Sequence, residues 1–176
     1  MSLSDRAPDQ ATRSPVSARQ LAIMAIFIAL SAVGSLFKIP SPVGSIGLDS
    51  APGFFAAIAF GPWIGLIVIA IGHLLGAGIV GFPLTLPIHL AIAVGMGLCA
   101  LAFRWLGRRG KSPVWLVVAV VVTSLLNSVA LGLIVLPIGG WGMYAAAVPS
   151  LLVAAVVNTV IAAVAYLAVR DSKLLN

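Results

Sequence analysis

The sequence contains two long stretches without a charged residue, one between Asp49 and Arg104 and the other between Lys111 and Arg170. A helix of about 20 apolar residues crosses the bilayer core, so each stretch has room for more than one crossing. Only 8% of the residues are charged and 61% are hydrophobic, whereas soluble domains carry about 25% charged residues. The chain is therefore predicted to be an all-α integral membrane protein and not a soluble enzyme, whose surface needs charge to stay dispersed.

The positive charge is distributed as in membrane proteins. The net charge is +6, from ten basic and four acidic residues. A nucleic-acid-binding surface gathers Lys and Arg on one face beside base-reading polar residues. Here the basic residues occupy short breaks between apolar stretches, as the positive-inside rule describes. We therefore expect the lipid bilayer as a partner and no nucleic acid. The single Cys99 lies in an apolar run and is expected to be a packing residue.

Four segments have the length and composition of membrane spans. Residues 21–37, 114–136 and 148–169 are uncharged and predominantly apolar. Residues 84–103 qualify if Pro87 lies in the first turn of the helix, where a missing N–H does no harm. Each of these segments can cross about 30 Å of hydrocarbon.

Residues 51–80 are harder to assign because Gly61-Pro62 interrupts them. If they form two helices, the chain has six spans, and with an internal N-terminus nine of the ten basic residues are cytoplasmic. Only Lys38 is then external. With five spans, the basic cluster 104–111 would be external, so the positive-inside rule favours six spans with both termini cytoplasmic. The short helix 50–60 is then expected to rely on protein neighbours to satisfy its ends.

The predicted domain organisation is simple. Residues 1–18 are polar and are expected to form a disordered cytoplasmic tail. Residues 19–171 form the six-helix membrane domain, and residues 172–176 a second cytoplasmic tail. The first apolar run is followed by Lys38-Ile39-Pro40 instead of a small-residue cleavage site, so it is interpreted as a membrane helix and not as a signal peptide.

Polar side chains at membrane depth are expensive, so each one is a candidate for function. Most of these residues fall in the outer half of the predicted topology. The candidate substrate-binding residues are Asp49, His73, His89, Asn127, Trp141, Tyr144 and Asn158. Structural alternatives remain open for several of them: the two aromatic residues could form an interfacial belt, the two Asn could join helices by hydrogen bonds, and Asp49 could cap the second helix.

Neither a catalytic site nor a cofactor or metal site is expected. His73 and His89 lie on different helices with no acid beside them in the sequence, whereas zinc takes three or four protein ligands. Gly110-Lys111-Ser112 ends like a phosphate-binding loop, but the pattern requires Gly where Trp105 stands. An embedded enzyme or a scaffold remains as an alternative to a binding protein.

Small residues form stripes on two of the predicted helices. Ala22, Ala25, Ala29 and Ala32 share one face of the first span. Gly61 and Gly65, and likewise Gly72 and Gly76, are four positions apart around the third. Such stripes allow helices to approach closely. They could serve packing within the bundle or present a smooth face to a separate membrane subunit.

One stretch of the chain resembles a known family. Lys38-Ile-Pro-Ser-Pro-Val-Gly, Leu48-Asp49-Ser-Ala-Pro52, Phe60-Gly-Pro62, Gly72-His-Leu-Leu75 and Pro87-Ile-His-Leu90 are similar to the substrate-binding S components of energy-coupling factor (ECF) vitamin transporters. The resemblance is strongest over residues 20–105, and the six-span plan extends it to residue 170.

The resemblance implies a subunit that captures a micronutrient outside the bacterial cytoplasmic membrane and works with a membrane coupling (T) subunit and two cytoplasmic ATPases. It implies that Ala25 and Ala29 face the coupling subunit, because members of the family commonly carry Ala-x-x-x-Ala there. It also implies that the first external loop, residues 38–50, covers the pocket as a lid. Many members have Asp where this chain has His73.

The small number of charged residues on the outer side limits the charge that the ligand can carry. Only Asp49 and Lys38 are available there, so a multiply charged ligand would lack counter-ions. Aromatic rings, amides, hydroxyls and His suit a neutral heteroaromatic compound with hydroxyl groups. Residues 39–90 most resemble the subgroup assigned to α-ribazole, a nucleoside-like precursor of cobalamin, with riboflavin or another neutral vitamin as the alternative. Free-standing uptake is not expected, because no intramembrane acid is available to couple protons or sodium.

Overall fold

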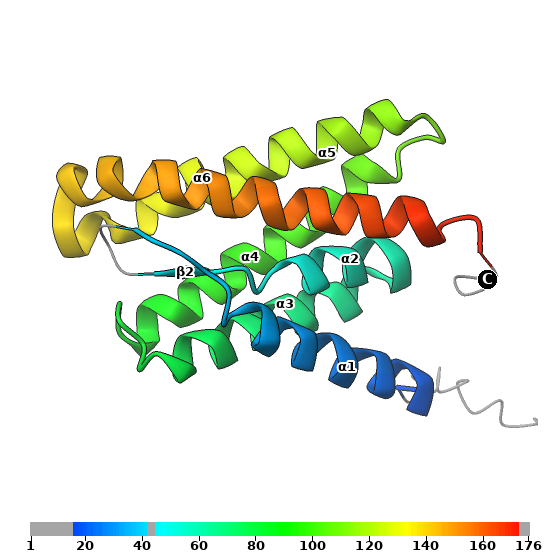
Figure 1. Ribbon diagram of the computed structural model, residues 1–176, viewed down its shortest axis with the longest axis horizontal. Coiled ribbons are helices and arrows are strands. Elements are labelled where there is room, and N and C mark those ends of the chain that lie inside the picture. Colours follow the sequence, from blue (N-terminus) through cyan, green and yellow to red (C-terminus); the bar gives the residue numbers. More distant parts are fainter. Residues whose placement is uncertain (1–15, 42–44, 173–176) are drawn as a thin grey trace, which may run out of the picture.

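The computed structural model describes residues 16–41 and 45–172, which form a bundle of helices with one small hairpin (Figure 1). Residues 1–15 and 173–176, which make up most of the two predicted tails, lie outside the described residues. The helices are α1 (Ala18–Gly34), α2 (Ala51–Phe60), α3 (Pro62–Ile79), α4 (Leu86–Gly107), α5 (Pro113–Leu125) and α6 (Leu136–Val169).

Three helical stretches are long and apolar enough to cross a membrane: α3, α4 and the continuous helical segment from Pro113 to Val169. Helices α1 and α2 are apolar but shorter. The interruption predicted at Gly61-Pro62 is confirmed, because α2 ends at Phe60 and α3 begins at Pro62. Pro87 lies in the first turn of α4, as predicted.

The connection between the predicted spans 114–136 and 148–169 is helical and belongs to α6. The C-terminal part of the first of these spans is not a regular α-helix. A π-helical segment, η1 (Leu126–Ala130), and a 3-10 segment, η2 (Leu131–Val135), follow α5 directly and lead into α6. The chain kinks inside α6 at Gly140, where φ is 61° and ψ is −164°. Glycine adopts this conformation without steric cost. Helices α5 and α6 then lie side by side along one flank of the bundle (Figure 1).

The all-α prediction needs one correction in the loop that follows α1. Strand β1 (Lys38–Ile39) pairs with β2 (Ile46–Gly47) in an antiparallel hairpin, with Ile39 opposite Ile46. The backbone N–H of Leu48 donates to the carbonyl of Phe37 across 2.9 Å and extends the pairing. Residues 42–44 of the predicted lid lie outside the described residues. The hairpin lies at one end of the bundle, called here the pocket end.

The glycine stripes of α3 serve packing within the bundle. A Cβ on Gly65 would collide with Ala57 of α2, and a Cβ on Gly72 would lie 2.5 Å from the Cβ of Ser31 in α1. Helix α3 therefore approaches both neighbours more closely than larger residues would allow. The alanine stripe of α1 is different, because Ala25 and Ala29 are exposed among the described residues.

The N-terminal end of α2 is satisfied by a side chain from α6. The backbone N–H of Ala51 donates to Oδ1 of Asn158 across 2.8 Å, and Nδ2 of Asn158 donates to the carbonyl of Ala154 across 2.9 Å. Asn158 is buried. A buried free N–H is costly, so Asn158 supplies the cap that α2 lacks, since Ser50, its N-cap, makes no side-chain capping bond.

The C-terminal end of α2 is satisfied by two arginines of α4. Arg104 donates to the carbonyls of Ala57 and Ile58 across 2.7 and 3.0 Å, and Arg108 donates to the carbonyl of Ile58 across 2.9 Å. Cations also interact favourably with the negative end of a helix dipole. The expectation that the short helix depends on protein neighbours is confirmed at both ends.

Candidate functional site

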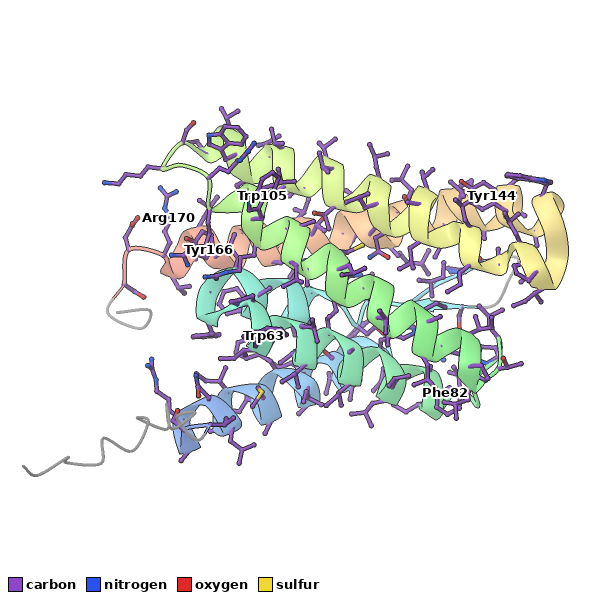
Figure 2. The ribbon with its side chains drawn as sticks, turned by 180° about the vertical axis from the view of Figure 1, so that it is seen from behind. Trp63, Phe82, Trp105, Tyr144, Tyr166 and Arg170 are labelled. Atoms are coloured by element: carbon purple, nitrogen blue, oxygen red, sulfur yellow. The ribbon has the colours of Figure 1, made fainter. Side chains whose placement is uncertain are left out.

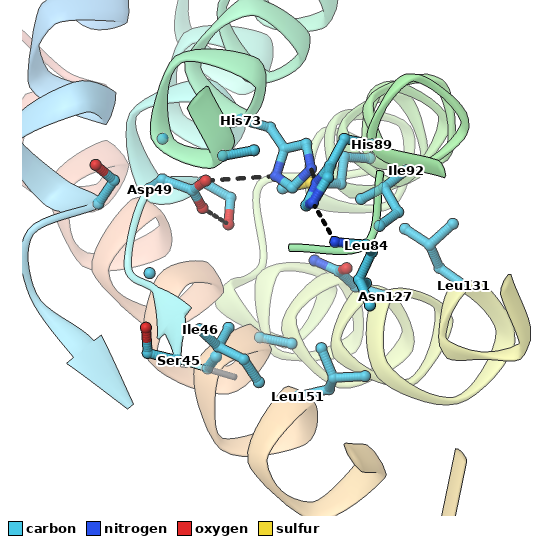
Figure 3. Close-up of a pocket in the computed structure, with 18 of the residues that line it drawn as sticks. Ser45, Ile46, Asp49, His73, Leu84, His89, Ile92, Asn127, Leu131 and Leu151 are labelled. Atoms are coloured by element: carbon cyan, nitrogen blue, oxygen red, sulfur yellow. Dashed lines mark hydrogen bonds and ion pairs between the residues drawn. The ribbon is translucent and has the colours of Figure 1, made fainter. Parts of the chain in front are cut away.

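A cavity of about 160 Å³ lies at the pocket end, between the hairpin and helices α3, α4 and α6 (Figure 3). Most of its wall is apolar, from residues such as Ile92, Met96, Leu131 and Leu151. Five of the seven predicted site residues line it, and they come from distant parts of the chain. These are Asp49, His73, His89, Asn127 and Asn158. Ser45 and Ile46, which belong to the loop that the resemblance implies as a lid, also line the cavity.

A chain of polar contacts runs along one side of the cavity (Figure 3). Nε2 of His73 lies 3.1 Å from Nδ1 of His89, and Nδ1 of His73 lies 3.5 Å from Oδ2 of Asp49. At one end the backbone N–H of Leu84 donates to Nε2 of His89 across 3.4 Å. At the other end the hydroxyl of Ser50 donates to Oδ1 of Asp49 across 3.3 Å.

These partners assign the protons of both rings. A backbone N–H can only donate, so Nε2 of His89 accepts and its proton lies on Nδ1 in the neutral ring. Nδ1–H of His89 then donates to Nε2 of His73, and Nδ1–H of His73 points to the Asp49 carboxylate. In this arrangement each of the four ring nitrogens has a partner.

The expectation that no acid accompanies the two histidines is wrong, because Asp49 lies beside His73. Asp49 is far from both in the sequence, and only the return of the first loop to the start of α2 brings its carboxylate to His73. The alternative role of Asp49 as helix cap is also not what the structure shows, because the N-cap of α2 is Ser50. In the described part of the chain, no three His, Cys, Asp or Glu side chains are arranged to hold a metal ion.

The turn between α3 and α4 closes the cavity from a second side. Pro83 and Leu84 line the wall. Phe82 and Thr85 have positive φ values of 51° and 72°, which cost free energy in residues with a Cβ. The ring of Phe82 packs edge-on against His89, with centroids 5.6 Å apart. The chain of polar contacts therefore joins this strained turn to the first loop, and no sequence signal predicted that connection.

Asn127 lies in the π-helical segment η1. Its half-buried side chain lines the cavity, and its amide makes no hydrogen bond to another described residue. Single π-helical turns inside longer helices occur frequently at functional sites. Asn127 thus offers a donor and an acceptor to a ligand, whereas the amide of Asn158 is engaged at both its oxygen and its nitrogen.

The remaining two predicted residues do not line the cavity. The side chain of Trp141 is 69% exposed. It packs edge-on against Tyr144, whose hydroxyl donates to the carbonyl of Val129 across 3.1 Å. Tyr144 lies at the pocket end of the bundle, as Figure 2 shows. An exposed aromatic pair at one end of a bundle fits an interfacial belt.

Comparisons with known proteins agree with this architecture. The family model for the "ECF transporter, substrate-specific component" matches residues 19–170. The chain belongs to this family. A solved structure described as "Structure and mechanism of the S component of a bacterial ECF transporter" is similar in fold, with a TM-score of 0.60 and 16% sequence identity over 86% of this chain and 93% of that chain. No curated protein matches the sequence.

Membership of the family has general consequences. ECF S components are substrate-binding transporter subunits and not enzymes, and the family implies a small-molecule substrate together with an ECF module of T and ATPase subunits. The apolar helices agree with a multi-pass membrane protein.

Proposed function

We propose that this S component captures a neutral heteroaromatic vitamin or vitamin precursor, and that α-ribazole is the best candidate. The observation that carries the proposal is a mostly apolar cavity lined by the free amide of Asn127 and by the contacting rings of His73 and His89. The wall contains one carboxylate and one ammonium group, from Asp49 and Lys38. A multiply charged ligand would leave its charges uncompensated, so riboflavin or another neutral vitamin is the runner-up.

The size of the cavity adds a requirement. An engineered cavity of about 150 Å³ holds one benzene ring, so about 160 Å³ suits a single ring. A nucleoside-like ligand fits only if the hairpin moves outward. We therefore propose that the loop containing Ser45 and Ile46 opens for entry, and that Asp49 and His73 re-form their contact once the ligand is bound.

The proposed topology is six spans with both termini in the cytoplasm. Its basis is the distribution of charge along the bundle. Arg104, Arg108, Lys111 and Arg170 lie at the end opposite the cavity, called here the basic end, and Lys38 lies beside the cavity. The positive-inside rule puts the basic end in the cytoplasm. Single-cysteine variants at Ser45 and Lys111, in a Cys99→Ala background, should react with a membrane-impermeant thiol reagent from opposite sides.

The ligand is tested directly by native mass spectrometry of the purified protein. A mass shift equal to that of α-ribazole is expected in protein from cells supplied with it, and isothermal titration should then show binding. Titration with riboflavin is the matched comparison. If riboflavin binds and α-ribazole does not, the runner-up replaces the first candidate. If only a multiply charged compound co-purifies, the inference that the ligand is neutral is wrong.

Docking on the coupling subunit is proposed for the exposed face of α1 that carries Ala25 and Ala29. The variant Ala25→Trp should reduce ligand uptake by cells at least tenfold, because a large ring prevents close helix approach. Ligand binding by the purified variant should be unchanged, since the face lies away from the cavity. Leu30→Trp, at an exposed position on a different face of α1, is the control. Full uptake by Ala25→Trp in cells containing the partner subunits would contradict docking at this face.

A further inference from the structure

A second hollow, of about 440 Å³, lies at the basic end between the C-terminus of α4, the start of α5 and the C-terminus of α6. Arg108, Lys111 and Arg170 line it together with Tyr166. Figure 2 shows Tyr166 and Arg170 at the end of the bundle opposite Tyr144. Nothing in the proposed capture of a ligand uses these residues.

The hollow has an excess of positive charge. Among the described residues, Asp171 is the one acid that lines it, and its carboxylate lies 3.3 Å from Nε of the adjacent Arg170. Lys111 makes no ion pair with any residue that the structure describes. Arg108 uses one nitrogen on the carbonyl of Ile58 and has further N–H groups to donate. Two net positive charges are therefore available to a ligand.

Two further features favour a phosphate group there. Ser112 caps α5 by accepting from the N–H of Val114 across 3.3 Å, so the positive end of this 13-residue helix lies at the rim of the hollow. The hydroxyl of Tyr166 makes no hydrogen bond to a described residue and can donate to an oxygen. Helix N-termini and Arg side chains are the usual partners of phosphate in proteins.

The surroundings of the hollow indicate where the phosphate comes from. Trp105 is 60% exposed, and the guanidinium carbon of Arg109 lies 4.1 Å from the centroid of its ring. Exposed Trp side chains mark the headgroup level of a membrane. Val117, the residue after Leu116 of the hollow, exposes apolar surface on α5. A ligand with a phosphate at the hollow can therefore lay apolar chains along α5.

We propose that this hollow binds the phosphate headgroup of an anionic lipid from the leaflet at the basic end. Phosphatidylglycerol carries one negative charge and a phosphodiester, and basic pockets between membrane helices bind such headgroups. Two net positive charges match one or two anionic lipids. The lipid would bridge α4, α5 and α6 at the point where their ends separate.

The experiment uses the full-length protein in detergent, without its vitamin ligand. Native mass spectrometry with added phosphatidylglycerol should show a bound lipid, and phosphatidylcholine should bind at least tenfold more weakly. The double variant Lys111→Gln/Arg170→Gln should lose most of this preference. The matched control, Arg19→Gln/Lys38→Gln, removes two positive charges outside the hollow. It should keep the preference for phosphatidylglycerol. Lys111→Arg/Arg170→Lys, which keeps the charge, should also keep it.

Several outcomes would overturn the proposal. It fails if both lipids bind equally, or if the control variant loses as much preference as the double variant. Millimolar inorganic phosphate is the third arm. If phosphate alone displaces the lipid completely, the hollow recognises a soluble phosphate compound and the lipid source is wrong. Retained binding of the vitamin ligand at the other end shows that the double variant is folded.

Discussion

The polar side chains at the two ends of the bundle differ in their hydrogen-bond partners. At the basic end, Arg104 and Arg108 donate to backbone carbonyls of α2, and these bonds hold a helix in place. At the pocket end, the rings of His73 and His89 bind each other, and Asn127 has an amide without a protein partner. At the basic end, these two arginines complete the fold beside a hollow that keeps other donors for a phosphate. At the pocket end, Asn127 leaves hydrogen-bonding capacity for the captured ligand.

This difference explains why intramembrane polarity alone does not identify a binding site. Buried polar groups must be paired whatever their function. Residue type and depth in the membrane therefore do not separate groups that complete the fold from groups that bind a ligand. The two roles differ in whether the hydrogen-bond partner of the polar side chain is another residue of the protein. Asn158 and Asn127 illustrate it within the pocket end, because both line the cavity and only Asn158 is fully engaged.

The largest expected effect is at the basic end. Arg104→Ala removes two hydrogen bonds from a charged donor. The carbonyl of Ala57 then loses this donor, whereas the carbonyl of Ile58 keeps its bond from Arg108. Such bonds contribute about 1.5–3 kcal/mol each, so the free energy of unfolding should fall by about 2–4 kcal/mol. Detergent-induced unfolding followed by circular dichroism measures it. Arg109→Ala, which removes a cation–π contact, is the control and should cost less than about 1 kcal/mol.

A similar loss of unfolding free energy in Arg104→Ala and Arg109→Ala would show that the bonds from Arg104 to α2 do not stabilise the fold specifically. The ends of α2 would then be satisfied by lipid or water, and the contrast drawn above would be weaker.

The second prediction separates the two asparagines. Asn127→Leu should weaken ligand binding at least tenfold and leave the thermal transition of the ligand-free protein nearly unchanged, because no described residue loses a hydrogen bond. Asn158→Leu should lower the free energy of unfolding by about 1–3 kcal/mol, because the buried N–H of Ala51 loses its acceptor. Thermal unfolding and ligand titration of both variants give the result. If Asn127→Leu is the less stable variant, their assigned roles are reversed.

The sequence predicted much of this fold because the dominant signals were local. Apolar length located the helices, Gly61-Pro62 marked the break, and Pro87 marked the start of α4. Five site residues were found because polarity at membrane depth is visible in a sequence. The hairpin was missed, since two-residue strands carry almost no periodicity.

The organisation of the site could not be predicted, because it depends on contacts between distant segments. The pairing of Asp49 with His73 requires the return of a loop. The π-helical turn at Asn127 and the positive φ values of Phe82 and Thr85 follow from tertiary packing and not from local propensity. Trp141 was selected for its residue type, which fits a ligand stack and an interfacial belt equally well.

A third prediction concerns the contact between His89 and the turn after α3. His89→Leu removes the acceptor for the N–H of Leu84, so this amide should exchange its hydrogen several-fold faster in hydrogen–deuterium exchange. Ligand dissociation should become faster by a similar factor, because the strained turn is then held less firmly. His89→Gln keeps an acceptor and should restore part of the protection. Unchanged exchange in His89→Leu would show that the histidine chain does not restrain the turn.

The smallest effect is expected at the exposed aromatic pair. Trp141→Ala should change ligand affinity by less than about twofold, because an exposed ring outside the cavity contributes little to a buried contact. Isothermal titration checks it, with Tyr144→Phe as the companion variant. A tenfold loss for Trp141→Ala would mean that the ring enters the cavity when the ligand binds, and would bring Trp141 back into the site.

Helix α2 has ten residues, so it is about 15 Å long and spans about half of a hydrocarbon core roughly 30 Å thick. Ser45, Ile46, Gly47, Asp49 and Ser50, which precede α2, line the cavity. The cavity therefore lies where further turns at the start of a longer α2 would run. In this architecture, the space for a ligand thus depends on the length of α2. A chain that lengthens α2 by one turn reduces the ligand it can hold, and one that unwinds a turn makes room for a larger molecule.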